Sequence, residues 1–318
     1  MADNSELLTK VAYLYYKNDL TQQQIANQIG LSRSKVVRLL QEAKRTGIVR
    51  IEIVKKLPLQ EEVAFDLQRL FKLQRAIVVR TEESQAYTLE SIRSAVANLI
   101  IDELQNVKNI GFGYSRTLGN IADYIHADSD SYDVAVCDLM GAMIGYSLPY
   151  GPAADVARRI GGTFYPISAP IMALEGSEAE VYLADHNLKR SMQAAGEVQL
   201  AVVGIGDSST QNILYRSGYI TEETVNNMRR QGIVGEICMH FFNANGMRVE
   251  SEIESRIISV PWNSLKRAKI ITAVFSESHK VLPTLAALKT GVISVLVTDD
   301  RTAKKILKLH RQTDLTDN

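Results

Sequence analysis

Three basic side chains stand close together near the start of the chain, at Arg33, Lys35 and Arg38, with Ser34 between the first two. Guanidinium and ammonium groups bind phosphate oxygens, and either group pairs with the edge of guanine in the major groove of DNA. Ser34 offers a smaller polar contact. These residue types at this spacing indicate binding to double-stranded DNA if one surface presents them together.

Residues 21–46 read as two short helices joined by a tight turn, and the second helix would carry these side chains. Thr21 followed three residues later by Gln24 fits a capping box at the start of the first helix. Gly30 suits a turn that requires positive φ, and Ser32 is a favourable N-cap for the second helix. The pattern predicts a helix-turn-helix, which places its second helix in the major groove.

Apolar and polar residues of the second helix fall on opposite arcs. The apolar arc consists of Val36, Val37, Leu39, Leu40 and Ala43. The polar arc consists of Ser34, Lys35, Arg38, Gln41 and Arg45. A supporting helical pattern precedes the pair at residues 7–15, and an alternating run at residues 48–54 predicts a short strand, the wing of a winged-type domain. An ordinary amphipathic hairpin with a solvated charged face is the alternative.

The charges are unevenly distributed along a chain that is neutral overall, with 36 basic and 36 acidic residues. Residues 1–56 hold 10 Lys and Arg against 5 Asp and Glu, whereas the remaining residues hold 26 against 31. A basic segment favours phosphate contacts, and a helix N-terminus such as that at Thr21 and Gln22 also attracts a phosphate. The candidate DNA-binding residues are Thr21, Gln22, Ser32, Arg33, Ser34, Lys35 and Arg38.

The length suits two domains, which we place at residues 1–56 for DNA binding and 57–318 for effector binding and oligomerisation. No run of about 18 apolar residues predicts a membrane span, and the N-terminus has no apolar signal core. Cys137 and Cys238 form no CxxC motif, and the histidines form no HxxxH or HExxH pair. We therefore expect reduced thiols in the cytoplasm, with no metal, no cofactor and no membrane partner.

From residue 60 onward, short apolar runs alternate with helical patterns. Strands are predicted at residues 76–79, 110–112, 133–139, 163–167, 200–205, 270–275 and 292–297. Helices are predicted at residues 88–104, 153–160, 222–230, 282–289 and 302–309. Such alternation predicts an α/β domain with a mostly parallel sheet and helices on both faces. Ligands of such sheets bind at the carboxyl ends of the strands.

Two glycine-containing segments follow predicted strands. Residues 110–117 read IGFGYSRT and lead from a strand into a predicted helix, and residues 203–210 read VGIGDSST and repeat the arrangement. Glycines with Ser and Thr beside a helix N-terminus make a cradle for an anion. Neither segment matches a Walker motif or a full GxGxxG, so a simple tight turn remains the alternative for each.

Two further side chains could contact a ligand at this edge. Lys280 precedes an apolar helix, where its ammonium would reach a phosphate as a point charge; a solvated surface lysine is the alternative. Glu236 follows Gly235, and its carboxylate would accept a hydrogen bond from a sugar hydroxyl; ordinary exposure on the surface is the alternative.

Several blocks of the chain resemble the SorC-type, DeoR-like family of sugar-binding bacterial transcriptional regulators. The first block is LYYKNDLTQQQIANQIGLSRSKVVRLLQEAKRTGIV. The later blocks, in the order of the family, are AVVGIG, RSGYIT, GIVGEICMHFFNANG and TGVISVLVTDDRTAKKIL. The resemblance extends over essentially the whole length.

The resemblance implies a Rossmann-like effector domain similar to sugar-phosphate isomerases but without their activity. It also implies a homo-oligomer, a tetramer built as a dimer of dimers. The ligand would be a phosphorylated sugar, a polyol or a related metabolite. The effector-binding positions that it implies are Gly111, Gly113, Ser115, Thr117, Gly206, Ser208, Glu236 and Lys280.

The chain departs from its relatives at two positions. Met140 lies in a segment where one branch carries a lysine that bonds covalently to a sugar aldehyde. Methionine has no amine and forms no Schiff base, which argues against aldehyde trapping here. Glu236 stands where many relatives carry Asp, which leaves the identity of the sugar open.

We therefore expect a cytoplasmic, non-enzymatic regulator that binds double-stranded operator DNA and a phosphorylated carbohydrate. The main alternative is a sugar-phosphate isomerase or deaminase with an appended DNA-binding domain, for which Asp138, Asp207 and Glu236 are carboxylates near the pocket loops. An architectural DNA binder is a third possibility, but it leaves the large sheet domain without a role. The residues do not determine whether the ligand releases DNA or strengthens its binding.

Overall fold

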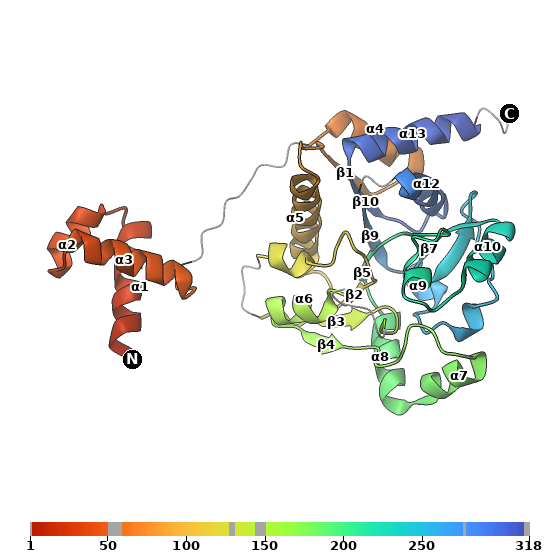
Figure 1. Cartoon of the computed structure of the whole chain (residues 1–318), viewed down its shortest axis with the longest axis horizontal. Helices are drawn as coiled ribbons and strands as arrows, with labels where there is room; N and C mark the ends of the chain where they lie inside the picture. Colours follow the sequence, from red (N-terminus) through yellow and green to blue (C-terminus); the bar gives the residue numbers. More distant parts are fainter. Residues whose placement is uncertain (1, 50–58, 127–130, 144–150, 276–277, 315–318) are drawn as a thin grey trace. The chain divides into compact units, whose positions relative to one another are not determined.

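The computed structural model describes residues 2–49, 59–126, 131–143, 151–275 and 278–314. The chain forms two compact units, unit 1 at Met1–Lys56 and unit 2 at Leu57–Asn318 (Figure 1). Buried apolar side chains form one core in unit 1 and two cores in unit 2.

Unit 1 contains three described helices, α1 (Ala2–Tyr16), α2 (Gln22–Ile29) and α3 (Arg33–Arg45). The predicted capping signals are confirmed. The Thr21 hydroxyl accepts a hydrogen bond from Gln24 N, while the Gln24 side chain accepts one from Thr21 N at 2.9 Å. Gly30 ends α2 with φ +70°, and Ser32 Oγ caps α3 by accepting from Lys35 N at 3.2 Å. Short-range hydrogen bonds thus fix the turn between α2 and α3.

The apolar arc of α3 faces the core of unit 1. Val36, Leu39, Leu40 and Ala43 are buried there against α1 and α2, as the pattern predicts, while Val37 is half-buried. The predicted wing is not confirmed: residues 48 and 49 form a bend, and residues 50–54 lie outside the described residues.

The described residues of unit 2 form an α/β unit with two sheets. The larger sheet consists of β1 (Arg75–Val79), β2 (Asn109–Phe112), β3 (Ala135–Asp138), β4 (Thr163–Tyr165), β5 (Leu200–Val203), β9 (Lys269–Val274) and β10 (Val295–Asp299). Its order is β1-β10-β9-β5-β2-β3-β4, and all of its described pairings are parallel. The predicted mostly parallel sheet is therefore confirmed. The smaller sheet is antiparallel and was not predicted; it consists of β6 (Gly206–Asp207), β7 (Ile233–Ile237) and β8 (His240–Asn243).

Alternate residues of the parallel strands enter the two cores of unit 2, because successive side chains of a strand point to opposite faces. Leu200 and Val202 enter one core, whereas Ala201 and Val203 enter the other. The first core is covered by α5 (Gln85–Glu103), the 3₁₀ helix η1 (Ile121–Tyr124) and α6 (Ala153–Ile160). The second is covered by α4 (Glu61–Phe71), α8 (His186–Gly196), α12 (Val281–Lys289) and α13 (Asp300–Asp314).

The remaining described helices are short or lie outside the main layers. They are α7 (Gly176–Ala184), α9 (Ile213–Arg216), α10 (Glu222–Arg230), α11 (Trp262–Leu265), η2 (Glu254–Arg256) and η3 (Ser278–Lys280). The predicted helices at residues 88–104, 153–160, 222–230, 282–289 and 302–309 correspond to α5, α6, α10, α12 and α13. Within the described residues, no helix has the length and apolar content that crossing a lipid bilayer requires.

The two glycine segments do not lead into α-helices of useful length. After β2 the chain forms a turn and then the 3₁₀ helix η1, and after β5 it forms β6 and then the four-residue helix α9. The prediction of a helix N-terminus at each anion cradle is therefore wrong. Leu118 and Ile121 pack into the core of unit 2, which holds the chain after β2 in a turn followed by a 3₁₀ helix.

Candidate functional site

A pocket lies at the carboxyl edge of the parallel sheet, where the loops after β2, β5 and β9 meet. Its described lining is residues 114–117, Met140, 204–206, 211–213, Glu236, Cys238, Met239, 273–275 and Lys280. This is the edge that the sheet topology predicts for a ligand. The small sheet contributes Glu236 and the turn that joins β7 to β8.

Five of the eight predicted effector-binding residues line this pocket. They are Ser115, Thr117, Gly206, Glu236 and Lys280. Gly111, Gly113 and Ser208 are not part of its described lining, so the structure does not bring them to the site as the resemblance implied.

Packing explains the three exceptions. A Cβ on Gly111 would lie 2.4 Å from Leu139 Cδ2, so this glycine makes room for a core side chain. A Cβ on Gly113 would lie 3.2 Å from Cys238 Sγ, beneath the floor of the pocket. Ser208 belongs to the turn after β6, where its carbonyl accepts a hydrogen bond from Arg229 Nε at 2.6 Å.

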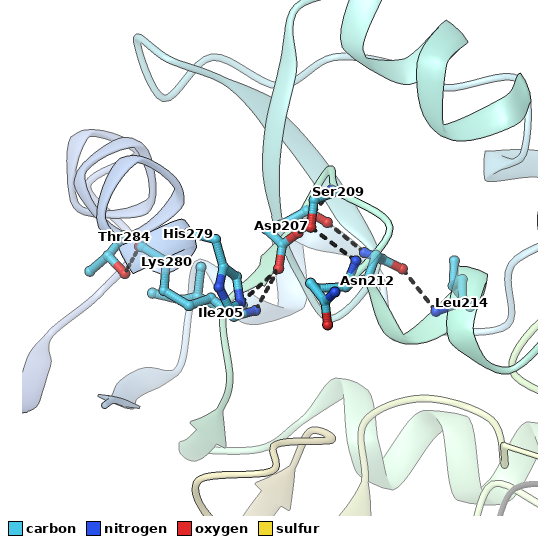
Figure 2. Close-up of polar contacts among 9 residues, drawn as sticks. Ile205, Asp207, Ser209, Asn212, Leu214, His279, Lys280 and Thr284 are labelled. Carbon is cyan, nitrogen blue, oxygen red and sulfur yellow. Dashed lines mark hydrogen bonds and ion pairs between the residues drawn. The ribbon is translucent and has the colours of Figure 1, made fainter. Parts of the chain in front are cut away.

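Lys280 is directed into the protein rather than into solvent, and its side chain is only 16% exposed. Its ammonium donates a hydrogen bond to Ile205 O at 2.8 Å and lies 3.1 Å from Asp207 Oδ2 (Figure 2). The alternative of a solvated surface lysine is therefore wrong. An ammonium has three N–H donors, so these two partners, the ones found among the described residues, leave one donor for a ligand in the pocket.

Asp207 was not among the predicted effector-binding residues, yet it is buried directly behind Lys280. Ser209 donates hydrogen bonds to Asp207 Oδ1 from its backbone N, at 2.8 Å, and from its hydroxyl. Burial raises the pKa of Asp207, but the charge of Lys280 and the hydrogen bonds from Ser209 outweigh it and hold the pKa below its ordinary value. The side chain therefore remains a carboxylate. The Asp-Ser-Ser sequence, typical of an Asx turn, was the local signal for this arrangement.

Glu236 is almost completely buried at the pocket. Its Oε2 accepts a hydrogen bond from Met239 N at 2.7 Å, and it also accepts one from the backbone N of Gly206. Burial raises its pKa, and these hydrogen bonds and the charge of Lys280 offset only part of that effect. A Cβ on Gly206 would lie 1.8 Å from Glu236 Oε1, so only glycine leaves room for the carboxylate.

The turn between β7 and β8 contributes two residues in the left-handed region, Cys238 at φ +47° and Met239 at φ +63°. Non-glycine residues are uncommon there, and such strain is often found at ligand sites. Ser259 Oγ donates to Cys238 O at 2.8 Å, and the Glu236 carboxylate accepts from Met239 N, so both neighbours hold the turn. Burial raises the pKa of the Cys238 thiol, which is therefore neutral. The sequence analysis did not predict this part of the pocket.

The candidate DNA-binding residues lie on α3 and at the N-terminus of α2. Arg33, Ser34, Lys35 and Arg38 are exposed on α3, opposite its buried arc. Thr21, Gln22 and Ser32 lie at the two helix starts, where the Thr21 and Ser32 hydroxyls accept backbone hydrogen bonds as caps. The structure thus brings the basic side chains onto one solvent-facing helix surface.

Comparison with known proteins gives consistent results. A family model described as "Putative sugar-binding domain" matches residues 58–308. The transcriptional regulator LsrR of Enterobacter sp. (strain 638) is 28% identical over 309 residues, which cover 96% of this chain and 93% of LsrR. The erythritol catabolism regulatory protein EryD of Brucella abortus (strain 2308) is 28% identical over 312 residues, which cover 96% and 98%.

Among solved structures, the full-length sorbitol operon regulator SorC from Klebsiella pneumoniae matches with a TM-score of 0.75 at 24% identity, covering 95% of this chain and 98% of SorC. This likeness shows the same fold. The names of the relatives favour a regulator over the isomerase or deaminase alternative. The chain therefore belongs to the SorC family of transcriptional regulators and carries the sugar-binding domain of that family at residues 58–308.

Proposed function

We propose that this regulator binds operator DNA through α2 and α3 of unit 1 and a phosphorylated carbohydrate in the pocket of unit 2. One observation carries the proposal: a single chain holds an exposed cationic helix face in one unit and a half-buried ammonium in a pocket of the other. Arg33, Lys35 and Arg38 supply the base and phosphate contacts, with Ser34 as a smaller polar contact. The helix N-termini at Thr21, Gln22 and Ser32 attract phosphates through their backbone N–H groups.

The pocket offers groups for both parts of a phosphorylated carbohydrate. Lys280 and the hydroxyls of Ser115 and Thr117 suit a phosphate, because charge-assisted hydrogen bonds to an oxyanion are the strongest available. Glu236 suits a hydroxyl of the sugar or polyol, and Gly206, which also lines the pocket, leaves the room that the Glu236 carboxylate occupies. Met140 lines the same pocket and, lacking an amine, forms no covalent adduct with an aldehyde.

We further propose that the protein is not an enzyme and that it acts in the cytoplasm as a tetramer, a dimer of dimers. Isomerisation needs a general base that reaches the substrate. Glu236 is held by two backbone N–H groups and Asp207 by Lys280, so neither carboxylate is poised for proton transfer. Asp138, the third candidate, is not part of the described lining of the pocket. A symmetric oligomer would place recognition helices about 34 Å apart, or at a multiple of that spacing, along the operator.

The proposal is tested by measuring operator binding, thermal stability and turnover of the full-length chain with a panel of phosphorylated sugars and polyols. We expect one or more compounds to raise the melting temperature and change operator affinity without being converted. Lys280→Met should lose this response and keep operator binding, whereas Lys305→Met, on the exposed surface of α13, should keep both. Turnover of a ligand, or an unaltered response in Lys280→Met, would contradict the assignment of the pocket.

A further inference from the structure

Asp207 lies behind the pocket rather than in it. It is 3% exposed and is not part of the described lining, whereas its neighbour Gly206 and its partner Lys280 both are. Its Oδ2 lies 3.1 Å from Lys280 Nζ and 3.7 Å from His279 Nε2, so it faces two consecutive residues of η3 (Figure 2). A ligand in the pocket would therefore contact Lys280 and not Asp207.

The loop after β6 holds the Asp207 carboxylate in one orientation. Ser209 fixes Oδ1 through its backbone N and its hydroxyl, and Asn212 Nδ2 donates to the carbonyl of Asp207 at 2.7 Å. Asn212 in turn caps α9 by accepting from Leu214 N at 2.8 Å. With Oδ1 committed to Ser209, Oδ2 is left to face the Lys280 ammonium and the His279 ring. Contacts within the protein thus hold this carboxylate in place.

The Lys280 side chain needs such an anchor. A lysine stem is flexible, and fixing it costs side-chain entropy. If the side chain became ordered only when the ligand binds, this cost would lower the affinity for the ligand. Ile205 O and Asp207 Oδ2 hold the ammonium from the protein side, and the hydroxyl of Thr284 donates to Lys280 O at 2.6 Å, which fixes the backbone.

We propose that Asp207 is a positioning residue: its carboxylate holds the Lys280 ammonium at the pocket wall, ready for the phosphate group of the ligand. This inference rests on the anion site proposed above. It predicts that Asp207 affects phosphate binding only through Lys280. Because Asp207 stays ionised, the interaction is present throughout the neutral pH range.

The test is a double-mutant cycle on the full-length chain, with inorganic phosphate as the probe and sodium chloride at equal ionic strength as the reference. The dose-dependent shift of the melting temperature gives the apparent phosphate affinity. We expect Lys280→Met to weaken it about tenfold or more, as loss of a charged hydrogen bond implies. Asp207→Asn should weaken it about fivefold, and the double variant should be no weaker than Lys280→Met alone.

Asp299 provides a matched control. It is also fully buried, and it caps α13 by accepting hydrogen bonds from Arg301 N and Thr302 N. Asp299→Asn should lower the melting temperature, but its affinity for phosphate should equal that of the wild type. If Asp207→Asn does not fold, Ser209→Ala is the alternative variant, because it removes a hydrogen bond to the same carboxylate. Ser209→Ala should weaken phosphate binding about twofold when Lys280 is present. It should not weaken phosphate binding further when it is combined with Lys280→Met.

The outcomes separate this inference from the proposed function. If Lys280→Met binds phosphate as the wild type does, the assignment of the anion site to this pocket is wrong. If Lys280→Met weakens binding but Asp207→Asn and Ser209→Ala do not, only the role of Asp207 is wrong. Equal losses from Asp207→Asn in the presence and absence of Lys280 would show that Asp207 supports the fold in general, and would also overturn the inference.

Discussion

Single charged residues of this protein act in two different environments. Arg38 is exposed on α3, where water screens its charge, and DNA would displace that water in the proposed complex. Lys280 and Asp207 are largely buried, so each must keep its partner, and removing one leaves the other uncompensated. Substitutions at the exposed site should therefore affect DNA binding alone, whereas those in the buried pair also affect stability.

The first prediction concerns Arg38. If it reads a base, Arg38→Ala should weaken operator binding by about 1–3 kcal/mol and relax specificity at one position of the operator. If Arg38 only contacts a phosphate, the loss of affinity should be similar for all DNA sequences. The slope of the logarithm of affinity against the logarithm of salt concentration should then become shallower by the contribution of about one phosphate contact. Fluorescence anisotropy with operator and scrambled duplexes at several salt concentrations distinguishes these outcomes.

The control for this prediction is Lys305→Ala, which removes the same charge from the exposed surface of unit 2. It should leave operator affinity unchanged. Arg38 would have no role in DNA binding if its variant behaved in the same way as this control.

The second prediction concerns Asp138, at the carboxyl end of β3. Burial raises its pKa to about 6 from the ordinary value of 3.8, although a hydrogen bond from the backbone of Ile167 acts in the opposite direction. The folded chain therefore binds this proton more tightly than the unfolded chain, so the stability of the wild type decreases as pH rises from about 4 to about 6. The side chain in Asp138→Asn carries no charge at any of these pH values, so this variant should not show the decrease in stability.

Urea unfolding of both proteins between pH 4 and pH 8 measures this effect. The stability of Asp138→Asn relative to wild type should increase through the window and then level off, by at most about 3 kcal/mol. Asp133→Asn is the control, because the Asp133 side chain is exposed. A constant difference between Asp138→Asn and wild type at all pH values would contradict the raised pKa.

At the scale of elements, the pocket depends on the fit between β6 and β7. Gly206 pairs with Glu236 across these two strands, and the Glu236 side chain occupies the space that a Cβ on residue 206 would need. The same carboxylate holds the strained turn at Met239. A glycine on one strand thus permits a buried acid on the next, and the acid fixes the turn that follows.

The third prediction follows from this contact. Gly206→Ala should destabilise unit 2 by about 1–3 kcal/mol, the usual cost of forcing an extra methyl group into a packed site. Because the clash is with a side chain, the same substitution should cost much less beside Glu236→Ala. Thermal unfolding followed by the fluorescence of Trp262, the single tryptophan, gives both values. An equal cost in both backgrounds would mean that the backbone, and not Glu236, excludes the methyl group.

At the scale of the whole molecule, function requires that two separately packed units influence each other's ligands. The chain divides at residues 56 and 57 into a basic unit and an acidic one. A ligand can change operator affinity only if it binds one state of the protein better than another. The two binding events must then be linked by a single coupling free energy.

The fourth prediction is this reciprocity. An active phosphorylated carbohydrate should change operator affinity by a factor of about 5 to 150, and saturating operator DNA should change the affinity for that compound by the same factor. Anisotropy measures the first and calorimetry the second, on the full-length protein at one salt concentration. Lys280→Met should remove both effects together. Unequal factors would show that the compound does not act through a linked equilibrium.

The sequence by itself determined the helix-turn-helix, because its signals are local. Thr21 and Gln24 are three residues apart, as are Ser32 and Lys35, so each cap forms within one helical turn. The alternation of strands and helices likewise predicted a parallel sheet and the edge at which its pocket lies.

Only the tertiary structure decided which residues meet in that pocket. Asp207 and Lys280 are far apart in the sequence and come together because β5 and β9 are neighbours in the sheet. The same strand packing buried Gly111 and Gly113, whose local pattern resembled that of a ligand loop. Long-range contacts of this kind depend on strand order and side-chain packing, and neither spacing nor composition along the chain encodes them directly.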